Sequence, residues 1–164
     1  MSDELRTRTV TWADPAVHAW RASSGPGLEI LRKVIAKERP SAPMASLMGY
    51  ELVEATEGRA VFTVAPAEFH YNPAGHVHGG FAATLLDSAM GCAVYTTVDE
   101  GSTYTTVELK VNYLRPITVA TGLVRAVGTL LHRGRRTAMA EGRLEDASGK
   151  LLAHATTTCL IWQV

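Results

Sequence analysis

Residues 78–98 read HGGFAATLLDSAMGCAVYTTV, and this stretch decides the fold. From Phe81 onward it is apolar at almost every position and leaves hardly any polar stripe, which is typical of a helix buried nearly all round. Asp87 is the only charged residue between His78 and Asp99. Because an ionised carboxylate among apolar side chains is costly unless something uses it, Asp87 is a candidate functional group. An Asp that faces a solvent gap or caps a neighbouring element is the alternative.

The sequence on either side of this helix predicts strands. Two short runs, 50–55 and 59–65, flank the turn signal Glu57-Gly58, and hairpin turns are expected at Gly134 and Ser148-Gly149. After the helix we predict four long strands, at 103–114, 119–132, 135–146 and 150–162. Strands linked by consecutive hairpins form an antiparallel sheet that can wrap around a single helix. The predicted fold class is therefore α+β, with a central long helix.

The first of these long strands alternates in character. Four apolar residues alternate with four polar ones, in the order Thr106, Val107, Glu108, Leu109, Lys110, Val111, Asn112 and Tyr113. Successive side chains of a strand point to opposite faces of a sheet. We therefore expect the apolar set on a packed face and the polar set, Thr106 included, on the other face.

Residues 1–45 are predicted to form a helical N-terminal extension, and residues 46–164 the main domain. Apolar positions at 28, 31, 34 and 35 repeat at helical spacing, and Pro40 and Pro43 end the segment. The extension is too short to fold alone, so we expect it to pack on the main domain. Its role there is open: it can cover a site, cover the sheet edge or build an oligomer.

The bulk composition describes one soluble globular domain. The chain has 164 residues, of which 46% are hydrophobic and 20% charged. Sixteen basic and sixteen acidic residues cancel, which argues against nucleic acid or an anionic membrane as the main partner. The first residues contain no apolar leader, and no apolar run approaches the roughly 20 residues of a membrane span. Cys92 and Cys159 lie in apolar stretches, so we expect buried free thiols and a cytoplasmic location.

The start of the predicted helix offers a second candidate group. Asn72-Pro73-Ala74-Gly75 forms a turn, and His78-Gly79-Gly80 then opens the helix. Amides of the first turn have no partners within a helix, and glycines let a ligand approach them closely. These amides and the helix dipole would stabilise a carbonyl oxygen that gains negative charge. A tight entry turn is the alternative interpretation.

The spacing of the two candidate groups constrains how they can work together. Gly80 and Asp87 are seven residues apart, which is roughly 10 Å along a helix axis. One helix therefore cannot readily bring its own amides and its own Asp to one small carbonyl group. Two copies with antiparallel helices across a two-fold axis can do so. We hypothesise that each site combines Asp87 of one subunit with Gly79 or Gly80 of the other.

These residues resemble the PaaI-type branch of the hot-dog acyl-CoA thioesterases. The stretch HYNPAGHVHGGFAATLLD at 70–87 has the family's Asn, Gly, His-Gly-Gly and acid at the expected offsets. The run TVELKVNYLRP at 106–116 matches its characteristic strand, and the likeness covers about residues 45–162. The resemblance implies a hot-dog fold, in which an antiparallel sheet wraps around a long helix, and acyl-CoA thioesterase activity.

The resemblance also implies roles for individual residues. Asp87 would be the catalytic carboxylate, as general base for water or as nucleophile on the thioester. Gly79, with Gly80 beside it, would polarise the thioester carbonyl, Asn72 would orient water or substrate, and His78 would shape the same pocket. A homodimer would be the minimal unit and a homotetramer the expected assembly. No cofactor is implied, because the CoA thioester is the substrate.

Further substrate contacts are expected from a hydroxyl and from cations. Thr106 aligns with a hydroxyl residue that helps to hold the water in some members, a role that needs a bulge in the strand. Some relatives carry a second hydroxyl one turn beyond the acid, where this chain has Gly91. CoA carries phosphates, and Arg133, Arg135 and Arg136 cluster at a predicted hairpin tip where they would suit phosphate. A solvated hairpin end explains this cluster equally well.

Other kinds of site fit the sequence less well. His70, His76 and His78 occupy alternate positions, but no Cys partner lies nearby and the glycine-rich turn breaks strand geometry, so no metal site is expected. A hot-dog dehydratase or isomerase would be another enzyme on the same scaffold. A non-catalytic acyl-CoA-binding module is the alternative from a different class. Thiol release from acyl-CoAs by the wild type and by Asp87→Asn distinguishes the three.

The acyl group itself is left open by the sequence. Phe81, Met90 and Tyr104 are candidates to line a pocket for an aryl or medium-chain acyl group. Core packing explains these three side chains as well.

Overall fold

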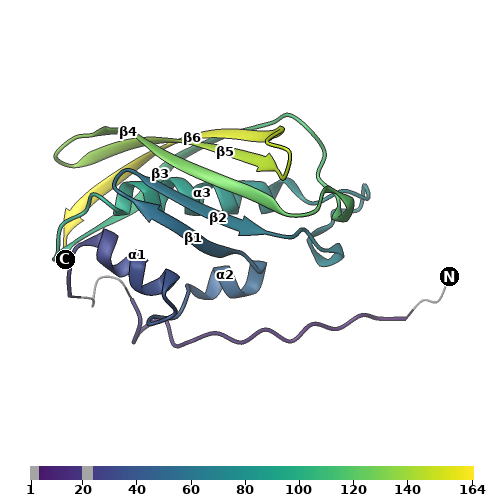
Figure 1. The fold of residues 1–164 in the computed structure, drawn as a ribbon, viewed down its shortest axis with the longest axis horizontal. Coiled ribbons are helices and arrows are strands. Elements are labelled where there is room, and N and C mark those ends of the chain that lie inside the picture. The colour runs from purple at the N-terminus through teal and green to yellow at the C-terminus, as the bar shows by residue number, and fades with distance from the viewer. Residues whose placement is uncertain (1–3, 20–23) are drawn as a thin grey trace.

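The computed structural model of the chain describes residues 4–19 and 24–164. Within these ranges six strands form one antiparallel sheet in the order β1-β2-β4-β5-β6-β3. The strands are β1 (Glu51–Thr56), β2 (Arg59–Val64), β3 (Ser102–Tyr113), β4 (Val124–Arg133), β5 (Thr137–Asp146) and β6 (Leu151–Gln163). Figure 1 shows the sheet curving over the long helix α3 (Gly79–Tyr95). The predicted α+β architecture with a central helix is confirmed, and it is that of a hot-dog fold.

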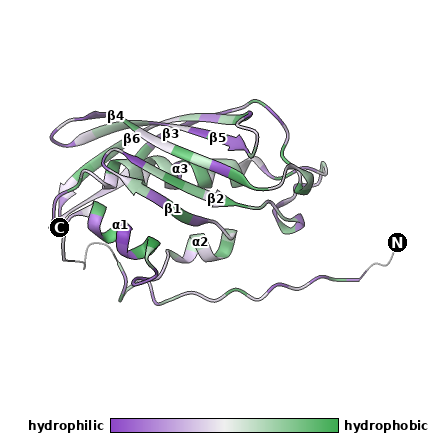
Figure 2. Ribbon diagram, in the orientation of Figure 1, coloured by the Kyte–Doolittle hydropathy of each residue, from purple (hydrophilic) through white to green (hydrophobic). Residues whose placement is uncertain are grey.

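Helix α3 forms the centre of the hydrophobic core. Figure 2 shows it coloured mainly as hydrophobic, and most of its side chains, such as Leu85, Leu86 and Met90, are fully buried. Gly79–Gly80, Ala83–Thr84 and Asp87–Ser88 are only half-buried, however. Residues four apart share one face of a helix, so these three pairs form a single stripe along α3. The expected burial all round is therefore incomplete, because the described part of the protomer leaves this stripe partly uncovered.

One strand begins later than the sequence pattern predicts. Val119–Thr121, the start of the predicted strand 119–132, form the short 3-10 helix η3. Gly122 follows with φ 71°, a left-handed conformation that glycine adopts readily and other residues avoid. β4 begins only after this turn, at Val124. The other predicted strands and the long helix lie within a few residues of their expected ranges.

Two short helices precede the sheet. α1 (Gly27–Ile35) confirms the predicted helix, and it buries Ile30, Leu31 and Val34 while packing against β1 and α3. α2 (Pro43–Met48) begins at a proline, because proline is well accommodated in the first turn of a helix. The predicted boundary after residue 45 falls inside α2, and the division into 1–45 and 46–164 stays a prediction. Residues 1–3 and 20–23 of the extension lie outside the described residues.

Strand β3 forms one edge of the sheet and contains a bulge. Its pairing with β6 shifts register between Thr106 and Glu108. Thr106 pairs with the buried Cys159, and Tyr104 pairs with the buried Ile161, so Thr106 lies on the inner face of the sheet. Alternation alone put Thr106 on the outer face. That prediction is wrong because the bulge inserts one residue and reverses the phase of the strand.

Three apolar side chains of β3 remain exposed in the single chain: Val107, Leu109 and Tyr113. Leu109 pairs with the buried Thr157 and so faces inward as predicted, yet it is 36% exposed. Tyr113 is 57% exposed, and Val107, at the bulge, is 58% exposed. Val111 packs against the core, so the predicted packed face is only partly packed within one chain. Among the described residues, no helix is long and apolar enough to cross a membrane.

Candidate active site

Asp87 lies midway along α3, on the half-buried stripe. Thr106, brought to the inner face by the bulge in β3, donates a hydrogen bond from Oγ1 to Oδ1 of Asp87 over 2.7 Å. The structure thus brings together two residues that the sequence proposed separately. Because a hydroxyl donor satisfies one carboxylate oxygen, the contact orients the carboxyl group.

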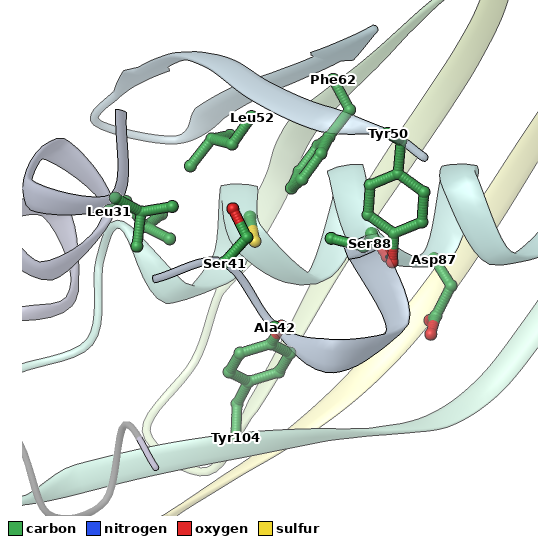
Figure 3. A pocket seen from close by; sticks show the side chains of 12 residues that line it. Leu31, Ser41, Ala42, Tyr50, Leu52, Phe62, Asp87, Ser88 and Tyr104 are labelled. Atoms are coloured by element: carbon green, nitrogen blue, oxygen red, sulfur yellow. The ribbon is translucent and has the colours of Figure 1, made fainter. Parts of the chain in front are cut away.

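A pocket with a volume of about 140 Å³ opens beside Asp87; we call it the acid pocket. Figure 3 shows the side chains that surround it. Next to the acid, the hydroxyls of Tyr50 and Ser88 are 2.9 Å apart. Farther from Asp87 the walls are apolar. The full lining is Leu31, Val34, Ser41, Ala42, Ala45, Tyr50, Leu52, Phe62, Asp87, Ser88, Cys92 and Tyr104.

Among the described residues that line the acid pocket, Asp87 is the only one suited to act as a base. Burial raises the pKa of Tyr50, raises that of Tyr104 well above its usual value, and raises that of the Cys92 thiol to about 12. These three groups therefore stay protonated at neutral pH. Cys92 and Cys159 are both buried free thiols, as predicted.

Tyr104 accounts for the glycine one turn beyond the acid. A Cβ atom on Gly91 would lie 2.5 Å from the Tyr104 hydroxyl oxygen, so this hydroxyl occupies the space that a larger residue 91 would need. Tyr104 also lines the acid pocket, as the sequence suggested. Phe81 and Met90 are buried in the core and are not part of the pocket lining.

The N-terminus of α3 presents a different set of groups. His78 caps the helix, and its Nδ1 accepts a hydrogen bond from the Gly80 N–H over 2.8 Å. The Gly80 amide is therefore engaged, and the ring proton of His78 lies on Nε2. The Gly79 N–H has no hydrogen-bond partner within residues 4–19 and 24–164. Of the two glycines, Gly79 is thus the one whose amide is available to an oxyanion.

Asn72 organises the loop that leads into α3. Its Oδ1 accepts hydrogen bonds from the N–H groups of Ala74, over 2.9 Å, and His76, over 3.3 Å. Its own N–H donates to the His76 carbonyl over 2.8 Å. The predicted turn is confirmed, and the side-chain oxygen of Asn72 is committed to it. A role for Asn72 toward water or substrate therefore rests on its amino group.

His70 contacts the start of α3 through its ring and its backbone carbonyl. Its Nδ1 accepts from the Ala67 N–H over 3.0 Å, and its Nε2 donates to the Met48 carbonyl over 3.0 Å. The ring packs on Phe81 with centroids 4.5 Å apart, and the His70 carbonyl accepts from the His78 N–H over 2.8 Å. Burial lowers the pKa of His70. The neutral ring is therefore a structural tie between α2 and the start of α3.

The Gly79 amide and Asp87 open to different pockets. Gly79 lines a second pocket together with His78, Tyr113 and Arg115; we call it the amide pocket. The amide pocket and the acid pocket share no lining residue. Both groups nevertheless lie on the same stripe of α3, two turns apart. This geometry agrees with the spacing argument that one chain does not unite the two groups at one carbonyl.

The three predicted arginines lie together at the turn between β4 and β5. Arg133, Arg135 and Arg136 line a third pocket with Asp99 and Trp162; we call it the arginine pocket. It shares no lining residue with the acid pocket. The Arg133 guanidinium donates to the Gly134 carbonyl, while its Nε is buried without a partner in the described part of the chain. The structure therefore brings the three arginines together, and their pocket is separate from the acid pocket that contains Asp87.

Sequence reasoning missed several residues of the acid pocket. Tyr50 stands just before β1 in no recognisable motif, and its contact with Ser88 depends on the tertiary fold. The apolar repeat at 28, 31 and 34 predicted a packed helix face, which α1 confirms. Nothing local in that repeat indicates that Leu31 and Val34 line the acid pocket.

Comparison with known proteins fits this geometry. Residues 74–153 match the family model described as Thioesterase superfamily. Acyl-coenzyme A thioesterase 13 of Mus musculus is 30% identical over 108 residues, which are 65% of this chain and 76% of that protein. The chain belongs to the thioesterase superfamily.

Structural similarity places this thioesterase in the PaaI-type group. A phenylacetic acid degradation-related protein of Ralstonia eutropha JMP134 is 29% identical, with a TM-score of 0.71 over 79% of this chain and 98% of that one. The PaaI protein of E. coli, 19% identical, has a TM-score of 0.71 over 84% of this chain and 94% of its own, which shows a common fold. The protein is a hot-dog thioester hydrolase, and the expectation drawn from the motifs is confirmed.

Proposed function

We propose that this thioesterase hydrolyses an acyl-CoA to the free acid and CoA, with Asp87 as the catalytic carboxylate. The observation that carries the proposal is the hydrogen bond from Thr106 to Asp87, beside a pocket whose described lining residues include no other carboxylate. The similarity to an acyl-coenzyme A thioesterase supports this substrate class. The buried free thiols Cys92 and Cys159 fit a cytoplasmic location, where CoA thioesters and reduced cysteines coexist.

The chemistry follows from the two groups on α3. Asp87 takes a proton from water while the water oxygen attacks the thioester carbonyl, or its carboxylate attacks that carbonyl directly. The carbonyl oxygen becomes an oxyanion, which the Gly79 N–H and the positive end of α3 stabilise. Collapse of the tetrahedral intermediate breaks the carbon–sulfur bond and releases the CoA thiolate.

The Gly79 amide in this site comes from a second subunit. A complete site needs Asp87 and an amide at one carbonyl, and Gly79 and Asp87, eight residues apart, lie roughly 12 Å apart along the helix axis within a chain. The half-buried stripe of α3 and the exposed apolar side chains of edge strand β3 are surfaces that a second copy would cover. A homodimer is therefore the functional unit, and pairs of dimers form a homotetramer.

The remaining predicted residues contribute to substrate binding. His78 holds the first turn of α3 through the Gly80 amide, and Asn72 holds the preceding loop. Both act near the Gly79 amide, where the thioester carbonyl would lie. The guanidinium groups of Arg133, Arg135 and Arg136 bind CoA phosphates, a role for which planar cations are suited.

Thiol release from a panel of acyl-CoAs tests the proposal. The wild type releases thiol, and Asp87→Asn, which keeps the shape of the side chain, lowers kcat by about 10²–10⁴-fold. Equal melting temperatures for the two proteins would show that the loss is chemical. Tight acyl-CoA binding without turnover in either protein would instead identify a binding module, and conversion of the acyl chain without thiol release a dehydratase or isomerase.

Single-turnover hydrolysis in heavy-oxygen water separates the two roles of Asp87. A general base sends the solvent oxygen into the product acid in the first turnover. A nucleophile forms an acyl–aspartyl anhydride, and attack of water on the aspartyl carbon then labels Asp87 and leaves the product unlabelled. Mass spectrometry of the acid and of the peptide that contains Asp87 reads out both outcomes.

A further inference from the structure

The acid pocket is partly built from the N-terminal helices. Five of its lining residues come from α1, α2 and the segment between them: Leu31, Val34, Ser41, Ala42 and Ala45. Figure 3 shows Leu31 at the end of the pocket far from Asp87, with Ser41 and Ala42 between the two. The N-terminal segment therefore forms a wall of the cavity that holds the catalytic acid.

This wall is a fixed part of the fold. Leu31 and Ile30 are 1% and 2% exposed, and the Gly27 N–H donates to the Val98 carbonyl over 2.9 Å. A Cβ atom on Gly27 would collide with the carbonyl oxygen of Tyr95 at the end of α3. The start of α1 is thus held in direct contact with the end of α3, and the position of Leu31 follows from that contact.

The chemistry of the lining restricts what can enter. Beyond Asp87, the pocket offers hydroxyls from Tyr50, Ser88, Ser41 and Tyr104 and otherwise apolar surface, and no Lys, Arg or His is among the described residues that line it. A carboxylate carried by the acyl group would be buried beside the carboxylate of Asp87 without a counter-ion, which is strongly unfavourable. The pocket therefore suits an uncharged acyl group.

The size of the pocket restricts the acyl group further. Along α3 the lining runs from Asp87 to Cys92, five residues or roughly 7.5 Å of helix. The volume of about 140 Å³ resembles that of an apolar cavity of about 150 Å³ that accepts a benzene-sized guest. An acyl group of about six carbons fills such a space.

We infer that α1 and the segment leading into α2 determine acyl-chain selectivity, with Leu31 at the far end of the pocket and Ser41 in its wall. The inference rests on the proposed function, because it takes the acid pocket as the acyl site. The selected substrates are thioesters of compact, uncharged acyl groups. Residues 74–153 carry the family match, so these selectivity residues lie outside it, where the chain can vary without touching Asp87 or Gly79.

The test compares kcat/KM for acetyl-, hexanoyl-, dodecanoyl- and glutaryl-CoA. The wild type prefers hexanoyl-CoA and discriminates against glutaryl-CoA. Ser41→Phe fills the pocket and lowers the hexanoyl-to-acetyl ratio at least about tenfold, since each methylene in such a pocket contributes about 10-fold or more. Ser46→Phe, the same exchange in α2 outside the pocket lining, leaves the ratio at the wild-type value.

Leu31→Ala provides the opposite change. It lengthens the pocket and raises the dodecanoyl-to-hexanoyl ratio about tenfold, and melting temperatures report whether each variant is folded. An unchanged chain-length profile in Ser41→Phe, or a wild type that favours glutaryl-CoA, would overturn the inference while leaving the proposed function intact. A wild type that releases no thiol from any of the four substrates would instead refute the proposed function.

Discussion

The two ends of the half-buried stripe on α3 differ in what they lack. At the first turn, the Gly79 amide has no partner among the residues that the structure describes, and none of those residues brings a carboxylate to the amide pocket. Two turns later, Asp87 is held by Thr106 beside an acyl-sized pocket, yet no backbone amide donor faces it among the interactions of the described residues. Each end supplies what the other needs.

Under the proposed function, this difference means that one short segment encodes a site that a single chain does not complete. A helix fixes the distance between residues eight positions apart, such as Gly79 and Asp87, at roughly 12 Å along its axis. The amide and the acid of one chain therefore cannot come closer together. An antiparallel second copy turns that fixed distance into a complementary pair of sites. In this account the oligomer is a requirement of the chemistry.

The largest expected effect comes from removing the Gly79 N–H alone, because this change tests the contribution of the amide without altering Asp87. Gly79→Pro removes this hydrogen, and proline suits the first helical position. His78, at φ −60° and ψ 138°, already has the extended conformation that a following proline requires. We expect kcat to fall by about 10²–10³-fold, the usual cost of losing one oxyanion-hole donor.

Gly79→Ala is the matched control for that change. It introduces a Cβ atom at the same place, 3.2 Å from the Tyr113 ring, but keeps the N–H. Because the contact is with the far end of the Tyr113 side chain, which needs to move by only a few tenths of an ångström, Gly79→Ala should retain most of the activity. Equal losses of kcat in Gly79→Pro and Gly79→Ala would mean that activity depends on the free space next to residue 79 and not on its N–H.

A change at the acid end should have a smaller effect. Thr106→Val keeps the shape of the side chain and removes the hydroxyl that donates to Asp87. We expect kcat to fall about tenfold, the worth of one hydrogen bond to a charged group. Thr106→Ser restores the hydroxyl and should restore the rate; if Ser and Val behave alike, Thr106 does not orient the acid.

The smallest expected effect is on the pH dependence of the melting temperature, through His70 beside the N-terminus of α3. Burial lowers the pKa of His70 below its ordinary value of 6.5, so the unfolded chain binds more protons than the folded one at mildly acidic pH. The stability contributed by neutral His70 is fully present above about pH 6.5 and decreases as the pH falls through the lowered pKa. The melting temperature should drop by a few degrees over this window.

Two variants assign that pH dependence to His70. His70→Gln removes the titrating ring and should flatten the profile, while the exposed His76 in the same loop serves as control, because His76→Gln should leave the slope unchanged. Since His70 holds the start of α3, hydrogen exchange at low pH should increase there before it increases around Asp87. A profile that His70→Gln does not alter would assign the titration elsewhere.

The fold and the two candidate groups followed from the sequence because their signals are local. An apolar helix with one acid, a glycine pair at its start and strands separated by turn residues all appear in continuous stretches. The spacing of Gly80 and Asp87 along a helix then gave the argument for a shared site without any tertiary information.

The features that the sequence did not predict depend on strand register and on side-chain packing. A single inserted residue between Thr106 and Glu108 reverses the strand phase, and no local pattern marks it. The choice between Gly79 and Gly80 depends on the His78 ring, which takes the Gly80 amide although histidine is not among the preferred capping residues. The contact of Leu31 with the acid pocket links segments more than fifty residues apart.

The most direct test of the shared site uses heterodimers isolated through two different affinity tags. A heterodimer of Asp87→Asn with Gly79→Pro contains one site with both defects and one intact site, so it should show about half of the wild-type activity. A heterodimer of the wild type with the double variant contains one defect in each site and should be nearly inactive. The opposite pattern, an inactive first heterodimer and a half-active second one, would contradict the account.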